Sequence, residues 1–194
     1  GTNAGVVHLL WGSQYGVTTD NDMRFNQGMV PDEAAETGDQ FGWALAAGDI
    51  YNDVKDDLIV SAPGQDIDDY EQAGVVHVVM GPFNHWEYSI TFHEPHHADL
   101  RYGYAIDSGD IDNNGYDDLV IGVPYYSYSI PSGGGQVVVY YVYAGHLQAQ
   151  WYYLNTISGD ELSIRENDHF GFAVAVLEEP HYNKTIFLPI IFKP

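Results

Sequence analysis

One acidic loop of this chain carries oxygen-bearing side chains at the spacing that a hard cation needs. The segment DIDNNGYDD covers residues 110–118, with side-chain oxygens at loop positions 1, 3, 5 and 9. Calcium takes about six to eight oxygen ligands, and alternate residues of a tight turn can converge on one point. Gly115, at position 6, is expected to permit the turn with a positive φ. We predict a calcium site with the ligands Asp110, Asp112, Asn114, the backbone carbonyl of Tyr116, and Asp118.

The alternative for this loop is a plain acidic turn, because Asp and Asn are common turn formers. Asp117 is expected to face solvent or to cap the turn.

A second loop, DIYNDVKDD at residues 49–57, has the same length but poorer ligands. Position 3 is Tyr51, and position 6 is Val54, where a positive φ is costly for a β-branched residue. Lys55 adds a positive charge. The remaining carboxylates make a weaker candidate calcium site, composed of Asp49, Asp53 and Asp57. The alternative is a turn that keeps its shape without metal. The corresponding third segment, EEPHYNKT at residues 178–185, predicts no calcium site.

The charge of the chain restricts its partners. Acidic residues outnumber basic ones by 28 to 6, which gives a net charge of −22 with His neutral. Such a chain repels nucleic-acid phosphates and anionic membranes and attracts cations. No apolar run reaches the roughly 18 residues of a membrane helix. We therefore predict neither nucleic-acid binding nor a membrane span.

Signals for catalysis are weak. The chain has no Cys, so disulfides, thiolate zinc sites and cysteine nucleophiles are excluded. The segment HEPHH at residues 93–97 matches the H-E-x-x-H zinc-protease motif, but that chemistry requires a helix. Here a predicted strand precedes it and Pro95 disfavours a helix. No nucleophile elbow or phosphate loop is present. The sequence predicts a protein that is not an enzyme.

These loops lie within an internal repeat. Residues 41–64 align with residues 102–125 at ten identical positions of 24, and a shorter copy, FGFAVAV, begins at Phe170. A second motif recurs as AGVVHLLWG (4–12), AGVVHVVMG (73–81) and GGQVVVYYVYAG (134–145). Successive copies are 61 to 69 residues apart, a period that indicates one supersecondary unit used in series.

Each complete unit is predicted to form four short strands. The expected strands are 41–48, 57–62, 74–80 and 87–93 in the first unit and 102–108, 118–123, 135–143 and 150–157 in the second, with 5–11 and 21–27 before them and 170–177 and 185–192 after them. Nearly continuous apolar runs are typical of strands covered on both faces. We predict an all-β fold of propeller blades with four antiparallel strands. The alternative is a two-sheet sandwich, which gives no reason for the repeat.

The repeated residues also resemble a known family. Phe41-Gly42, Gly48-Asp49, Asp57-Leu58 and Ala62-Pro63-Gly64, matched again from Tyr102-Gly103 to Val123-Pro124, are similar to the FG-GAP repeat of integrin α-subunit propellers. The resemblance covers about residues 1–178. It implies an extracellular propeller, often of seven blades, with calcium in some loops between first and second strands, serving adhesion or ligand binding. The fold is also attached to secreted enzymes.

The resemblance leads to one FG-GAP domain over residues 1–194, with repeat units at about 1–40 (partial), 41–101, 102–169 and 170–194 (partial). Twelve strands make three blades, fewer than the about four to eight of usual propellers. Three explanations stay open: a fragment of a longer propeller, assembly with other copies, or a ring closed by its own ends.

Partner contacts are expected at aromatic residues on a loop face, because rigid aromatic side chains suit protein or carbohydrate contacts. The candidates are Tyr125, Tyr126 and Tyr128. Asn183 begins an N-glycosylation sequon. We expect an extracellular, secreted or cell-surface calcium-binding module that acts in adhesion or structural assembly, with a protein or other copies of itself as partner. The alternatives are a non-catalytic domain of a secreted enzyme and a glycan-binding, lectin-like propeller.

Overall fold

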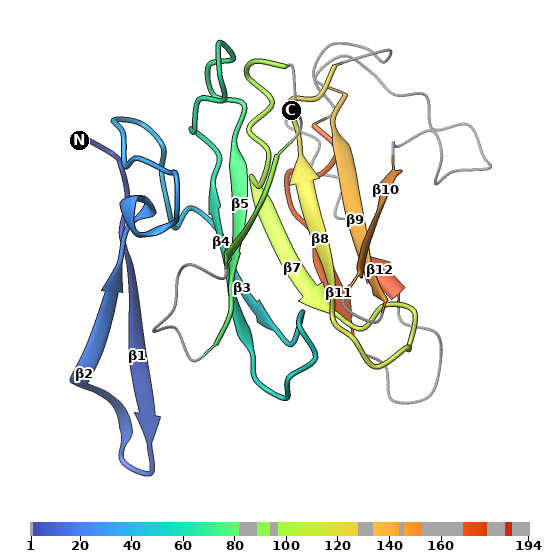
Figure 1. Ribbon diagram of the computed structural model, residues 1–194. Helices are drawn as coiled ribbons and strands as arrows, with labels where there is room; N and C mark the ends of the chain where they lie inside the picture. The colour runs from blue at the N-terminus through green and yellow to red at the C-terminus, as the bar shows by residue number, and fades with distance from the viewer. Residues whose placement is uncertain are drawn as a thin grey trace, which may run out of the picture.

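The computed structural model consists of four antiparallel sheets (Figure 1). The structure describes residues 2–81, 89–93, 97–127, 134–143, 146–152, 169–177 and 185–187. The strands are β1 (Val7–Ser13), β2 (Gly16–Phe25), β3 (Leu45–Gly48), β4 (Asp57–Ala62), β5 (Val75–Val79), β6 (Ser89–Phe92), β7 (Ala105–Gly109), β8 (Asp118–Val123), β9 (Gln136–Tyr143), β10 (His146–Tyr152), β11 (Ala175–Leu177) and β12 (Thr185–Phe187). Within the described ranges, the only helical element is a 3-10 turn, η1 (Gln27–Met29), and no helix is long and apolar enough to cross a bilayer.

The two complete sheets have the topology that the repeats predict. β3 to β6 form one sheet in chain order and β7 to β10 form the other, with every neighbouring pair antiparallel. The pairs Ala47–Leu58 and Ser108–Leu119 occupy the same register in the two sheets. The all-β fold with blades of four antiparallel strands is therefore confirmed.

The two shorter sheets are halves of the same unit. β1 carries the motif of β5, and β11 follows the same FG motif that precedes β3 and β7. β1 pairs with β2 at the left of Figure 1, and β11 pairs with β12 behind the sheet of β7 to β10, where β11 lies next to β7. In the described residues, β1–β2 thus corresponds to the second half of a blade and β11–β12 to the first half.

Strand boundaries differ from the predictions where the FG motif turns. β3 begins at Leu45 rather than at residue 41, and β7 begins at Ala105 rather than at residue 102. The backbone N–H of Trp43 donates to the carbonyl of Gln40 at 3.0 Å, which closes a turn before β3. β2 and β10 also begin earlier in the sequence than predicted, at Gly16 and His146.

The hydrophobic core lies between successive sheets. Because side chains alternate across a strand, β4 buries Ile59 against β7–β9 and Val60 against β1–β2. On β8, Ile121 faces the preceding sheet and Val120 packs with Phe170, beside β11. The central strands are thus covered on both faces, as their continuous apolar runs predict.

The backbones of the two complete repeats come into close contact at Gly74, the glycine of the AGVVHVVMG segment. The backbone N–H of Tyr102 donates to the carbonyl of Ala73 at 2.9 Å, and Gly74 adopts a φ of +85°. A Cβ at Gly74 would stand 2.5 Å from the backbone nitrogen of Tyr102. Only glycine fits there without displacing the neighbouring backbone.

Candidate metal centre and contact face

The Asp110 loop lies between β7 and β8 and brings three of its carboxylates together. Asp110, Asp112 and Asp118 each offer an oxygen within 4.8 Å of the others, and among the described residues no other three His, Asp or Glu groups do so. Asp118 is the first residue of β8 and pairs with Gly109, the last residue of β7. The loop therefore gathers its negative charge where the first two strands of the blade diverge.

The backbone of this loop is shaped by the carboxylate of Asp110. That carboxylate accepts hydrogen bonds from the backbone N–H groups of Asn114 at 2.8 Å and Gly115 at 3.1 Å. Gly115 has a φ of +92°, so the positive φ predicted for position 6 is confirmed. Asn113 also adopts a positive φ, +61°, which Asn tolerates better than most residues.

Asp118 is buried, and its carboxylate is held by backbone donors. Its oxygens accept from Ile111 N at 2.8 Å and Val142 N at 2.9 Å. Burial raises the pKa of Asp118 to about 6, against the lowering effect of these bonds. A cation at this position would favour the ionised carboxylate.

The other predicted ligands have different surroundings. The Asn114 side chain donates to the Val142 carbonyl at 2.8 Å and accepts from Tyr116 N at 2.8 Å, so it ties the loop to β9. A hydrogen bond to Asp112 raises the pKa of Tyr143. The roles of Asn114 and of the Tyr116 carbonyl as ligands stay predictions. The loop thus has three carboxylates, the Tyr116 carbonyl and the Asn114 side-chain amide, and their oxygens are of the type that calcium prefers.

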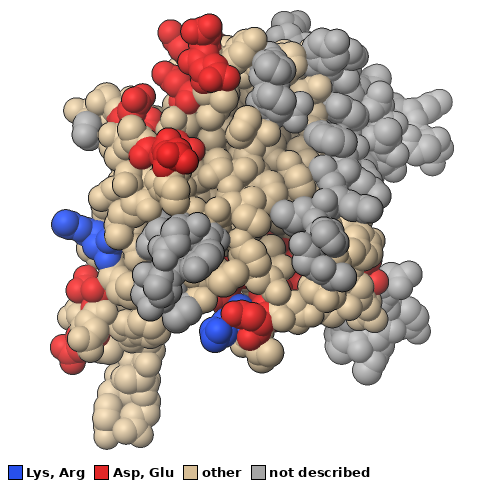
Figure 2. All heavy atoms as spheres, in the orientation of Figure 1, with Lys and Arg blue, Asp and Glu red and all other residues tan. Residues whose placement is uncertain are grey.

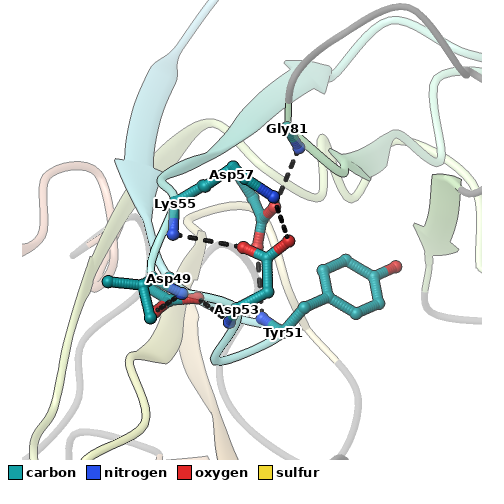
Figure 3. Close-up of polar contacts among 7 residues, drawn as sticks. Asp49, Tyr51, Asp53, Lys55, Asp57 and Gly81 are labelled. Carbon is teal, nitrogen blue, oxygen red and sulfur yellow. Dashed lines mark hydrogen bonds and ion pairs between the residues drawn. The ribbon is translucent and has the colours of Figure 1, made fainter.

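The Asp49 loop has the same backbone form but a different distribution of charge (Figure 3). Asp49 accepts from Asp53 N at 2.8 Å and Val54 N at 2.9 Å, as Asp110 does in the other loop. Asp57 accepts from Tyr51 N and Gly81 N, both at 3.1 Å. These carboxylates do not form one tight cluster among the described residues.

Two further features separate this loop from the Asp110 loop. Val54 adopts a φ of +70° with 93% of its surface exposed. The ammonium nitrogen of Lys55 lies 2.9 Å from a carboxylate oxygen of Asp53 (Figure 3). Burial raises the pKa of Asp57, and the Asp53 charge adds to that effect.

The structure corrects the expectation for Asp117. Its carboxylate accepts from the backbone N–H of Asp49 at 2.9 Å, so it caps the loop of the neighbouring blade rather than its own turn. The Ser108 hydroxyl donates to the Ala47 carbonyl at 2.8 Å in the same junction. The two acidic loops are therefore joined directly.

The predicted contact tyrosines have different positions. Tyr126 is only 5% exposed and packs in the core between the two complete sheets, which corrects its assignment to a contact face. Tyr125 is half-buried, with its ring centroid 4.9 Å from that of His169. Tyr128 and Asn183 lie outside the described residues.

Sequence reasoning missed a row of aromatic side chains beside Tyr125. The ring centroid of Tyr104 lies 5.2 Å from that of Trp43 and 4.6 Å from that of Phe172. Tyr125 meets Tyr104 at 6.0 Å, and the Arg101 guanidinium lies 5.8 Å from the Tyr125 ring centroid. The signal was present in the repeat, because FGW, YGY and FGF each place an aromatic residue directly after the glycine. We call Trp43, Tyr104, Tyr125 and Phe172 the aromatic row.

A polar cavity of about 320 Å³ lies between the first repeat and the segment before it. Its lining includes Asn3, Gln40, Asp66, Gln72 and Arg101.

Figure 2 shows Asp and Glu side chains gathered at the upper edge of the molecule in this view, with Lys and Arg at only a few separate points.

Comparisons with known proteins agree with the fold. The family model of the FG-GAP repeat matches residues 102–140. Integrin alpha-3 of Cricetulus griseus is 31% identical over 147 residues, which cover 74% of this chain and 13% of that protein. Integrin alpha-3 of Mus musculus is 30% identical over the same shares. Integrin alpha-PS3 of Drosophila melanogaster is 33% identical over 105 residues, or 53% of this chain and 9% of that protein.

The chain thus spans about a tenth of the length of these relatives. Its repeats, its four-stranded antiparallel sheets and these matches place the chain in the FG-GAP repeat family, with repeats of the integrin α-subunit type.

Proposed function

We propose that this chain is an extracellular, calcium-stabilised β-propeller module that has no catalytic role and acts in adhesion through protein–protein contacts. The observation that carries the proposal is the convergence of Asp110, Asp112 and Asp118 between the first two strands of an FG-GAP repeat. Similarity to integrin α-subunits supports the adhesive role.

Calcium at this loop has a clear structural purpose. Three carboxylates within 4.8 Å of one another repel when they are ionised. A bound calcium ion would offset that repulsion and hold β7 and β8 together at the loop. Extracellular modules bind calcium with dissociation constants of about 0.1–1 mM, which suits a site with few charged ligands.

The aromatic row supports a protein partner. Trp43 is 47% exposed, and its indole N–H donates to the Tyr104 carbonyl at 3.1 Å, which fixes the orientation of the ring. Rigid aromatic side chains supply much of the binding energy in protein interfaces. The Arg101 guanidinium beside Tyr125 adds a donor at the edge of this surface.

Two measurements test this function. Calorimetric titration with calcium chloride should show binding in the millimolar range that Asp112→Ala removes, and no binding heat in the wild-type protein would contradict the calcium assignment. In a cell-adhesion assay on matrix-coated plates, Trp43→Ala should reduce attachment. Tyr15→Ala is the matched control, because Tyr15 is an exposed aromatic residue outside the aromatic row. Equal attachment for both variants would count against the aromatic row as the contact surface.

A second candidate function is glycan binding, which the polar cavity favours. Amide and carboxylate side chains, such as those of Gln40, Gln72 and Asp66, suit the hydroxyl groups of sugars. On a glycan array, specific binding that Gln72→Ala abolishes would favour this function over adhesion through the aromatic row.

A further inference from the structure

The Asp49 loop holds a positive charge of its own. Lys55 contacts Asp53 twice: its backbone N–H donates to one carboxylate oxygen at 3.1 Å and its ammonium group to the other at 2.9 Å (Figure 3). The equivalent residues of the other loop are Tyr116 and Asn114, which form only the backbone contact, at 2.8 Å. The side-chain cation is thus specific to the Asp49 loop.

The third position of this loop does not supply a carboxylate. Tyr51 stands where the other loop has Asp112, and Tyr51 packs against the core between the two sheets. A phenol at this position does not supply the charged oxygen that a carboxylate offers to calcium.

The backbone nevertheless has the form of the Asp110 loop. Asp49 and Asp110 each accept from the residues four and five positions later, and the fourth residues, Asn52 and Asn113, have φ values of +52° and +61°. The sixth residue also has a positive φ in both loops. The same turn therefore forms around two different sets of side chains.

We propose that the Lys55 ammonium group takes the place of a metal ion in the Asp49 loop, so that this loop closes without calcium. The remaining oxygens, on Asp49, Asp53 and Asp57, fit calcium poorly. Asp53 is already paired with the Lys55 ammonium group, and position 3 of the loop has no charged side chain. The proposal concerns a loop outside the proposed calcium site and holds whether or not the Asp110 loop binds calcium.

Calcium stoichiometry provides the decisive test. In an Asp112→Ala background, which removes the site in the Asp110 loop, calorimetric titration with calcium chloride should show no bound ion. Tyr51→Asp added to that background should still give no bound ion, because Lys55 remains. Tyr51→Asp and Lys55→Met added together to that background should give one bound ion per chain. One ion in the Asp112→Ala protein, one ion after the further change Tyr51→Asp, or none after both further changes would each overturn the proposal.

A second measurement avoids substitution of the half-buried Tyr51. In EGTA, Lys55→Glu should lower Tm by about 2–4 °C, because a carboxylate then faces Asp53, and Lys55→Arg should leave Tm unchanged. Added salt should reduce the difference, since the Lys55–Asp53 pair is partly exposed. Equal Tm values for wild type and Lys55→Glu in EGTA would contradict the role of Lys55, whatever the Asp110 loop binds.

Discussion

The Asp49 and Asp110 loops connect equivalent strands in neighbouring repeats, have nearly the same backbone, and differ in how their charge is balanced. In one loop, three carboxylate oxygens lie within 4.8 Å of one another. In the other, Tyr51 replaces one carboxylate and Lys55 contacts a second. The turn and its metal ligands are therefore separable: backbone bonds to the first Asp set the turn, and side chains at positions 3 and 7 set the charge.

The two repeats also differ inside the blade. His77 on β5 is fully buried, with its Nδ1 2.9 Å from the Thr91 hydroxyl, whereas the equivalent residue on β9 is Val138. The Nε2 atom of His77 has no hydrogen-bond partner among the described residues. The first repeat therefore carries a buried imidazole that the second repeat lacks.

Calcium should give the largest effect. At about a hundred times its dissociation constant, calcium adds about 2.7 kcal/mol of stability, which for a chain of this size raises Tm by roughly 5–11 °C. Asp112→Ala should remove most of this rise, as measured by thermal unfolding in calcium and in EGTA. Tyr51→Ala, at the same loop position of the first repeat, should keep the calcium-dependent rise. A rise lost equally in both variants would contradict a calcium site confined to the Asp110 loop.

Mild acid should weaken the first repeat through His77. Burial lowers the pKa of His77 to about 4, below its unfolded value of about 6.5. Its contribution is therefore fully present above pH 6.5 and is lost as the pH falls towards 4, by up to about 1.4 kcal/mol per pH unit. His77→Val, which copies Val138, should flatten the profile of urea unfolding between pH 6.5 and 5. Parallel profiles for the two proteins would show that His77 is not the responsive group.

The sixth position of each loop should respond to glycine in opposite directions. Val54 holds a φ of +70°, which costs an L-residue about 1–2 kcal/mol. Glycine removes this strain but loses more backbone entropy on folding, so the two effects partly cancel. Val54→Gly should therefore stabilise the protein by a net amount of about 1 kcal/mol in urea unfolding. Gly115→Ala should destabilise it by a similar amount. A loss of stability with Val54→Gly would mean that the valine is not strained.

The bond between the two loops should give the smallest effect. Asp117→Ala removes the acceptor for Asp49 N and should cost about 0.5–1 kcal/mol. Hydrogen exchange at the Asp49 amide should accelerate. Asp56→Ala is the control, because Asp56 holds the equivalent position in the first repeat and is exposed. Unchanged exchange at Asp49 would show that the loops are independent.

Much of this protein is determined by its sequence. The repeat predicts the number and order of strands, because apolar runs separated by Gly, Asp and Asn can pair locally with their neighbours in the chain. The spacing of Asp110, Asp112 and Asp118 predicts their convergence, since nine residues of tight turn leave little other geometry. The positive φ of Gly115 follows from the same local constraint.

Only the tertiary structure decides the contacts between repeats. Asp117 bonds to Asp49 across 68 residues, and Trp43 stacks near Tyr104 across 61. Tyr126 is buried while the adjacent Tyr125 is only half-buried, although the sequence predicts both as contact residues. Local composition does not fix which face of one sheet meets the next. That choice depends on the packing of whole sheets, where side chains distant in the chain compete for the same buried space.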